Sequence, residues 1–172
     1  MLPADASASE ASAPGLPTER VFIGLGSNLG EREAWLHFAL KALAEAPFLR
    51  LVASSPFLEN QAVLLPGQAP QPPYVNAVAE VRCLHSPVEL LAFLLGLEER
   101  AGRKRQKRWE SRVLDLDLLS FGKRRVDSPQ LVLPHPRLHM RAFVLGPWAH
   151  IAPHLRLPGQ QLSISELYAR LA

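Results

Sequence analysis

The sequence is poor in the residues that build disulfide frameworks and soft-metal sites. It holds one cysteine, Cys83, among 172 residues, which excludes a disulfide framework and a cysteine metal site. No cluster of histidine and cysteine has zinc-site spacing. Because Cys83 lies in an apolar strand pattern, we expect it to pack in the core and not to act as a nucleophile.

Long apolar runs and targeting signals are also missing. No apolar run reaches the roughly 20 residues that a membrane span needs. The N-terminus has no basic region followed by an apolar one, and Asp5 and Glu10 argue against a transit peptide. We therefore expect a cytoplasmic protein without a membrane partner, and we expect a monomer.

The common nucleotide-binding motifs are absent as well. There is neither a Walker A loop nor a kinase HRD or DFG set. Residues 24–30 (GLGSNLG) resemble a dinucleotide loop only superficially, because the third glycine comes one position late and no acidic residue ends a second strand. Glycines that turn the chain tightly into a helix explain this run equally well.

Length and composition favour one packed domain. Residues 1–19 are rich in Ala, Ser and Pro, which predicts a mobile tail, and residues 20–172 form a single domain. Hydrophobic residues make up 48% of the chain, enough for a sizeable core. The net charge of +3 does not by itself imply a nucleic-acid partner.

The hydrophobic pattern predicts alternating strands and helices. Strands are expected over 21–25, 48–57, 74–83, 113–120 and 130–133, the last returning from a hairpin turn at 121–125. Helices are expected over 31–46, 86–101 and 164–171, the last two opened by capping boxes, and 58–73 is expected to be a long loop. In the first helix the apolar residues of one face are Trp35, Phe38, Ala39, Ala42 and Leu43. This order predicts an α+β fold, a ferredoxin-like sandwich with helices packed on a mainly antiparallel sheet.

Two carboxylates two positions apart mark the strand over 113–120. Asp115 and Asp117 face the same side of it, about 7 Å apart along the chain. They could be surface acids, but unpaired acids are rare in a strand this apolar. Hard oxygen ligands favour Mg²⁺, which also takes substrate phosphates.

Cations precede this strand. Five Arg or Lys residues, beginning at Arg103, lie before Trp109, and Arg112 follows it. Cations, an aromatic ring and paired carboxylates in so short a span indicate a site for a polyanion held by a divalent metal. Such a set suits phosphoryl-type transfer, which needs mainly positioning and charge neutralisation.

Other polar residues have two readings each. Tyr74 and Asn76 share a strand face, and from spacing alone a surface aromatic beside an edge amide is favoured over a platform for a heterocycle. His135 lies between two prolines and is either a turn residue or, with Arg141, a phosphate contact. Glu98 lies beside an apolar helix stripe.

Four separated motifs resemble those of the 6-hydroxymethyl-7,8-dihydropterin pyrophosphokinases of the folate pathway. Residues 112–122 (RVLDLDLLSFG) resemble the family's R-x-[L/I]-D-[L/I]-D signature, and residues 22–30 (FIGLGSNLG) resemble its first strand. Residues 74–78 (YVNAV) match its pterin-side strand, and 133–143 (LPHPRLHMRAF) with 151–153 (IAP) are similar to its C-terminal block. The resemblance spans about residues 20–170 in the same order.

The resemblance implies an enzyme that transfers the pyrophosphate of ATP to the pterin's hydroxymethyl group. Asp115 and Asp117 would bind two Mg²⁺ ions. Trp109 would lie on a mobile lid that closes over both substrates, and it would contact the pterin. The resemblance also assigns the remaining residues: Tyr74, Asn76 and Phe143 to the pterin, Glu98, Arg103, Arg112, Leu118, His135 and Arg141 to ATP, and Arg103 and Arg112 to catalysis.

The chain departs from the family pattern in its arginine-rich loop, which is one residue shorter than in some members, and at two further places. Glu110-Ser111 replaces a common Gly-Pro in the lid, and residues 59–63 (ENQAV) lack the usual Thr-x-Pro pattern.

A second hypothesis is a small basic RNA-binding α+β module, supported by the cations around Trp109 and by Tyr74 on a sheet face. Two acids amid the cations count against it, because they would repel phosphates without a metal.

Overall fold

A computed structural model of the chain describes residues 18–62, 64, 66–67, 69–102 and 112–171. The elements in chain order are β1 (Glu19–Ser27), α1 (Arg32–Glu45), β2 (Leu49–Ser54), β3 (Leu58–Asn60), β4 (Tyr74–Cys83), α2 (Pro87–Arg100), β5 (Asp115–Phe121), β6 (Val126–Asp127), β7 (Val132–Leu133), the 3₁₀ turn η1 (Leu138–Met140), α3 (Ala142–Ile151) and α4 (Ile164–Ala169).

The main sheet confirms the expected antiparallel arrangement. Its strands lie in the order β2-β4-β1-β5, every neighbouring pair is antiparallel, and the short β3 pairs with β4. The two halves β1-α1-β2 and β4-α2-β5 place β1 and β4 at the centre, which is the ferredoxin-like arrangement.

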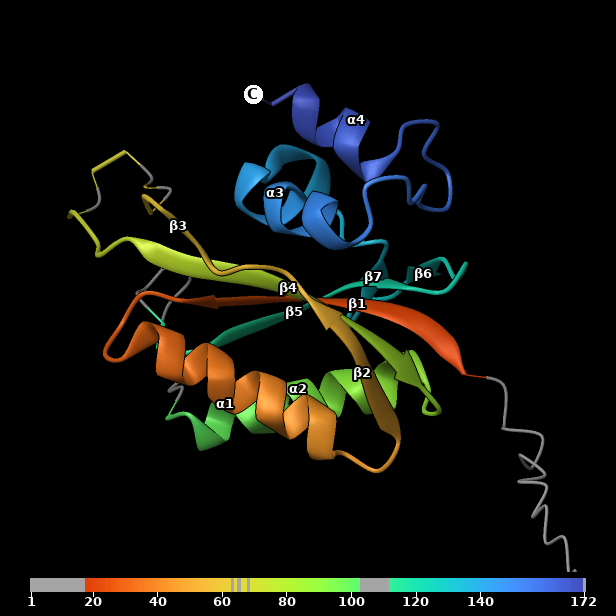
Figure 1. The fold of residues 1–172 in the computed structure, drawn as a ribbon, viewed down its shortest axis with the longest axis horizontal. Coiled ribbons are helices and arrows are strands. Elements are labelled where there is room, and N and C mark those ends of the chain that lie inside the picture. Colours follow the sequence, from red (N-terminus) through yellow and green to blue (C-terminus); the bar gives the residue numbers. More distant parts are fainter. Residues whose placement is uncertain (1–17, 63, 65, 68, 103–111, 172) are drawn as a thin grey trace, which may run out of the picture.

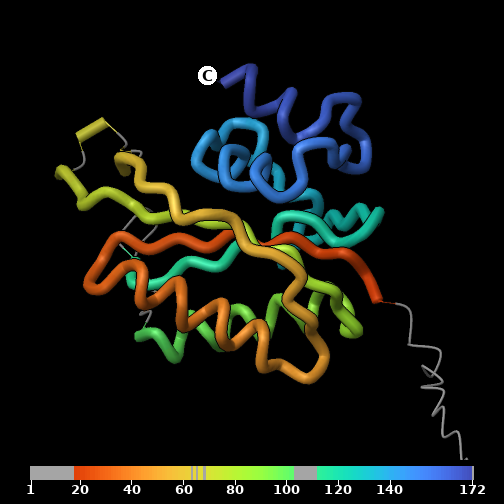
Figure 2. Tube along the Cα trace, viewed as in Figure 1, coloured from red at the N-terminus to blue at the C-terminus, as the bar shows by residue number. Residues whose placement is uncertain are grey.

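Helices cover both faces of this sheet. Helices α1 and α2 lie on one face and α3 and α4 on the other (Figures 1 and 2). Strand β4 shows why: Val75, Ala77 and Val81 join the core under α1 and α2, whereas Val78 joins the core under α3 and α4. A strand that is apolar on both faces can be buried only between two layers, so alternation along β4 builds two cores.

The helix starts follow local sequence. The side chain of Ser86 accepts a hydrogen bond from the Glu89 amide and Glu89 caps in return, and Ser163 and Glu166 do the same for α4.

In α1 the predicted face is right except for one omission. Leu36 is fully buried there with Ala39 and Leu43, while the predicted Trp35, Phe38 and Ala42 pack partly buried against the core.

Two expectations for the connecting segments are wrong. The predicted loop over 58–73 begins with β3, which pairs with the start of β4. The predicted returning strand is β7, but it pairs with β6 in a separate two-stranded sheet and not with β5. Strand partners depend on the tertiary fold, which local apolar runs do not record.

Some predicted features lie outside the described residues: most of the tail over 1–19, and residues 103–111 with Arg103, Trp109 and the altered Glu110-Ser111 pair. Within the described ranges, no helix is long and apolar enough to cross a membrane.

Candidate active site

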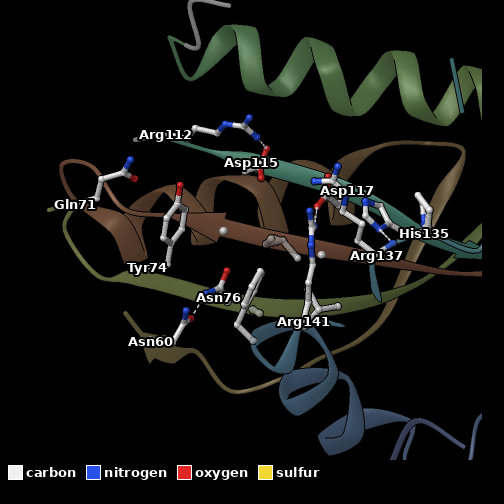
Figure 3. Close-up of a pocket in the computed structure, with 17 residues that line it drawn as sticks. Asn60, Gln71, Tyr74, Asn76, Arg112, Asp115, Asp117, His135, Arg137 and Arg141 are labelled. Carbon is white, nitrogen blue, oxygen red and sulfur yellow. Dashed lines mark hydrogen bonds and ion pairs between the residues drawn. The ribbon is translucent and has the colours of Figure 1, made fainter. Parts of the chain in front are cut away.

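A cavity of about 420 Å³ opens on the α3 side of the sheet, at the ends of β1, β4 and β5. Figure 3 shows its polar lining: Asn60, Gln71, Tyr74, Asn76, Arg112, Asp115, Asp117, His135, Arg137 and Arg141. Gly24 and Gly26 of β1 lie among the lining residues, between β4 and β5. Acidic and basic side chains therefore surround a cavity floor in which two glycines of β1 carry no side chain.

The glycines of β1 keep this floor open. Gly26 pairs with Asn76 of β4 on one side and with Asp115 of β5 on the other, and Gly24 pairs with Asp117. A Cβ atom on Gly26 would lie 2.9 Å from Oδ1 of Asn76, closer than such atoms pack. We expected these glycines to serve a tight turn, but both lie inside the strand, and Gly30 with φ 65° is the turn glycine.

The two carboxylates of β5 face this cavity together, as their spacing predicts. Asp115 and Asp117 line it, while Leu116 and Leu118 point into the core on the opposite face. Their side chains are 25% and 33% exposed, so both remain reachable from the cavity. Because the sheet is buried on both faces, a carboxylate pair here needs positive charge beside it.

Each carboxylate is paired with an arginine from a different segment. Arg112 Nη1 lies 2.5 Å from Asp115 Oδ1, and Arg141 Nη1 lies 3.0 Å from Asp117 Oδ2. Burial alone would lower the pKa of Arg112, but the charge and hydrogen bond of Asp115 raise it above its usual value. The cavity thus holds two cationic groups that can turn toward an anion if another cation takes their place.

His135 joins the cavity as a neutral ring. Burial, with Arg141 and Arg137 close by, lowers its pKa from 6.5 to about 4. The Arg137 amide donates to His135 Nδ1 at 3.2 Å, so the proton of the neutral ring is on Nε2. The His135 amide donates to the Leu119 carbonyl at 2.8 Å, which fixes this turn against β5. His135 can therefore donate one hydrogen bond without carrying charge.

Aromatic and amide groups line the opposite side of the cavity. Tyr74 and Asn76 come from β4 and Phe143 from the first turn of α3. Asn76 Nδ2 donates to Asn60 Oδ1 in β3, so its carbonyl oxygen is left toward Gly26. Two rings and an oriented amide can hold a flat heterocycle that has hydrogen-bonding edges.

Two predicted nucleotide contacts do not line this cavity. Glu98 is 1% exposed in α2, and its Oε1 accepts a hydrogen bond from the Leu116 amide at 2.7 Å. Leu118 is 4% exposed and packs in the core under α1 and α2. Glu98 thereby holds the segment of β5 between the two carboxylates.

Sequence reasoning missed three polar residues of the lining. Asn60, Gln71 and Arg137 all reach the cavity. Asn60 and Gln71 belong to the segment predicted as loop, where no periodicity marks a side-chain direction. Arg137 had a usable signal, since it lies two residues from His135 in the same rigid turn.

The cavity supplies some of the oxygen ligands that Mg²⁺ needs, and a bound substrate would have to supply others. No group of three His, Cys, Asp or Glu side chains suited to a metal occurs among the residues that the structure describes. Two carboxylates on one face are what Mg²⁺ uses when phosphate oxygens and water complete its shell. Asp115 and Asp117 would therefore hold the ion, and the arginines now beside them would have to move aside.

Comparison with known proteins gives a consistent match. Residues 22–153 match the family model of 7,8-dihydro-6-hydroxymethylpterin-pyrophosphokinase (HPPK). The chain is 44% identical to a 2-amino-4-hydroxy-6-hydroxymethyldihydropteridine pyrophosphokinase of Pseudomonas aeruginosa over 81% of this chain and 85% of that protein. It is 40% identical to the protein of the same name from Haemophilus influenzae, over 88% of this chain and 92% of that protein.

A solved structure agrees with the fold. A crystal structure of a Plasmodium falciparum HPPK-DHPS with pteroate superposes with a TM-score of 0.65 at 15% identity, covering 92% of this chain. The superposition covers 44% of that protein, so the present chain corresponds to less than half of its length. At this identity the likeness concerns the fold alone.

Proposed function

The chain belongs to the 7,8-dihydro-6-hydroxymethylpterin-pyrophosphokinase family, and from this premise we propose how its residues perform the family's reaction. The reaction transfers the pyrophosphate of ATP to 6-hydroxymethyl-7,8-dihydropterin and gives the pterin diphosphate and AMP, a step of folate biosynthesis. ATP and the pterin are the two substrates, and the cavity floored by β1 is the place we assign to their reacting groups.

The pterin lies on the side of β4 and α3 in this proposal. Tyr74 and Phe143 hold the faces of the ring, and Asn76 hydrogen-bonds its edge. The carbonyl oxygen of Asn76 is the atom offered to the ligand, since the bond from Nδ2 to Asn60 orients the amide with its oxygen toward Gly26. This suits the N–H donors of a pterin edge, because an acceptor selects for donors.

The phosphates lie on the side of β5. Arg112 and Arg141 neutralise them, and His135 donates from Nε2. Both arginines reach the cavity and both already face a carboxylate, which supports a role in balancing negative charge there. The nucleotide roles predicted for Glu98, Leu118 and Arg103, the pterin role of Trp109 and the catalytic role of Arg103 stay predictions.

Asp115 and Asp117 hold Mg²⁺, and we propose two ions as the resemblance implies. When bound there, the metal would supply positive charge that neutralises the triphosphate. When the arginines leave the carboxylates, their positive charge becomes available to the phosphates. In this exchange Mg²⁺ would take the place of the arginines beside the carboxylates, and the arginines would turn to the phosphates.

The bond changes are simple. The hydroxymethyl oxygen attacks the β-phosphorus of ATP, and an O–P bond forms while the bridge to the α-phosphorus breaks. The bridging oxygen leaves with AMP, and the hydroxyl proton passes to solvent. We assign no general base, because the chain's described contribution is orientation and charge.

The observation that carries the proposal is the convergence of Asp115 and Asp117 with Tyr74, Asn76 and Phe143 on one cavity. The test is release of AMP from ATP and Mg²⁺ by the purified chain, with and without 6-hydroxymethyl-7,8-dihydropterin. We expect AMP only when the pterin is present. AMP that forms equally without pterin, or no AMP at all, would contradict the proposed reaction.

The RNA-binding alternative finds no support. The matched family and the named relatives are pyrophosphokinases. The cytoplasmic location and the monomeric state stay predictions.

A further inference from the structure

Asn28 lies in the turn between β1 and α1 and is 1% exposed. It is not among the residues that line the cavity. A buried amide must satisfy an acceptor oxygen and a donor nitrogen at once. In Asn28 these two ends bond to two segments that are 40 or more residues apart and that flank the cavity.

The acceptor end holds Arg112. The backbone amide of Arg112 donates to Asn28 Oδ1 at 2.7 Å, and the backbone amide of Asn28 donates to the Arg112 carbonyl at 3.0 Å. Asn28 therefore fixes the main chain of Arg112 on both sides. From this fixed point the guanidinium reaches Asp115.

The donor end holds the segment before β4. Asn28 Nδ2 donates to the Pro72 carbonyl at 3.2 Å and lies 3.5 Å from Gln71 Oε1. Tyr74 follows two residues later as the first residue of β4. Figure 3 shows Gln71 and Arg112 at the end of the cavity where the ring of Tyr74 lies.

A second contact supports the same segment from α1. Arg32 Nη1 donates to the Pro73 carbonyl at 2.7 Å, and Arg32 pairs with Glu59 of β3 at 2.9 Å. Asn28 and Arg32 thus both hold the segment before Tyr74, one from the β1–α1 turn and the other from the start of α1. Asn28 is distinctive because its other end holds Arg112.

We infer that Asn28 is a positioning residue that couples the Arg112 side of the cavity to the Tyr74 side. The inference rests on the proposed function, in which Arg112 contacts ATP and Tyr74 the pterin. ATP then orders the segment of Arg112, and the pterin orders the segment that leads into Tyr74. Both segments are bonded to the buried side-chain amide of Asn28. Binding of one ligand reduces the cost of ordering for the other, and by linkage the effect is reciprocal.

Two substitutions separate the ends of the amide. Asn28→Asp keeps an oxygen for the Arg112 amide but removes the donor to Pro72, whereas Asn28→Ala removes both. Ser27→Ala is the matched control, since Ser27 is equally buried at the end of β1 and its hydroxyl donates to the local Leu29 carbonyl at 3.5 Å.

Binding is measured by calorimetry with 6-hydroxymethyl-7,8-dihydropterin and with Mg²⁺ plus α,β-methylene-ATP, each alone and in the presence of the other. Asn28→Asp should weaken pterin binding about tenfold, the effect of leaving a buried acceptor unsatisfied. It should leave the first binding of the ATP analogue nearly unchanged and reduce the mutual effect of the ligands. Asn28→Ala should weaken both ligands, and Ser27→Ala neither.

Amide hydrogen exchange of Arg112 gives a readout that needs no ligand. Exchange should be about tenfold faster in Asn28→Ala and unchanged in Asn28→Asp. If Asn28→Ala does not fold, Asn28→Asp alone decides, because it must reduce the mutual effect of the two ligands while keeping the Arg112 amide protected.

Failure of this inference differs from failure of the proposed function. A wild-type chain that binds neither ligand overturns both. A wild-type chain that binds both with mutual enhancement, beside an Asn28→Asp variant with the same enhancement, overturns the role of Asn28 only.

Discussion

At the scale of single residues, the carboxylates of β5 are the groups whose loss should matter most. Asp115→Asn and Asp117→Asn keep the side-chain shape but remove the charge that would hold Mg²⁺. We expect each to lower kcat for pterin-dependent AMP release by at least about a hundredfold, the usual cost of losing a strong electrostatic contact in a reaction centre.

The matched control is Asp127→Asn, the same change at an exposed position of β6. It should retain wild-type activity. The assay is repeated over a range of Mg²⁺ concentrations. An Asp117→Asn variant as active as Asp127→Asn would remove the metal role from this carboxylate.

His135 should make stability depend on pH. Its pKa falls to about 4 in the folded chain from 6.5, so the unfolded chain takes up the proton first as pH decreases. The stability linked to neutral His135 is therefore complete above pH 6.5 and is lost as pH falls toward 4, with a loss of roughly 1–3 kcal/mol after allowance for its partial exposure.

The measurement is urea unfolding at pH 7 and pH 4.5 for the wild type and for His135→Asn, which lacks the titrating group. The wild type should lose more stability than the variant between the two pH values. Equal losses would mean that His135 titrates normally. Because the ring is neutral at pH 7, ATP-analogue binding should not weaken between pH 6 and pH 7.5.

At the scale of elements, β1 is both the central strand and the floor of the cavity. Gly26→Ala would bring a Cβ atom to 2.9 Å from Asn76 Oδ1. We expect a higher KM for the pterin, because the oriented Asn76 amide has to shift, and a loss of about 1–3 kcal/mol in stability from overpacking.

Gly96→Ala makes the same chemical change where nothing lies within 4 Å, in the interior of α2. It should raise stability by up to about 1 kcal/mol through helix propensity and leave KM unchanged. Unfolding midpoints and steady-state kinetics of both variants test this. A Gly26→Ala variant that behaves like Gly96→Ala would show that the floor tolerates a side chain.

Elements marked by local sequence signals could be predicted, and elements that depend on tertiary contacts could not. Strand β4 has its predicted bounds because turn residues flank a clean alternation, and α2 begins as predicted because Ser86 and Glu89 form a local capping box. Strand β3 could not be predicted because three residues are too few to show a two-residue repeat. The partner of β7 could not be predicted because strand pairing depends on the tertiary fold.

The site divides in the same way. Asp115 and Asp117 could be placed on one face because the two-residue repeat of a strand is a local rule. The floor under them could not be predicted, because it requires the register that sets Gly26 between Asn76 and Asp115. The two-ended contact of Asn28 depends on segments brought together only in the folded chain.

At the scale of the whole molecule, the ion pairs of the cavity predict how ligands stabilise the fold. Mg²⁺ alone must displace Arg112 or Arg141 from its carboxylate, and the ATP analogue alone brings its charge beside Asp115 and Asp117. Mg²⁺ and α,β-methylene-ATP together should therefore raise the unfolding temperature by about 5–10 °C at a hundredfold excess over Kd.

Thermal scans with each ligand alone, with both, and with neither give the comparison. Either ligand alone should move the midpoint by much less than the pair. A shift with Mg²⁺ alone that equals the shift with the pair would mean that the carboxylates bind metal without any phosphate, against the exchange we propose.

Product analysis by ³¹P NMR tests the transfer most directly. The wild-type chain is incubated with ATP, Mg²⁺ and 6-hydroxymethyl-7,8-dihydropterin, and every phosphorus product is identified. Attack at the β-phosphorus predicts equal amounts of AMP and a pterin diphosphate, with no ADP. Formation of ADP with a pterin monophosphate would show attack at the γ-phosphorus and would contradict the account.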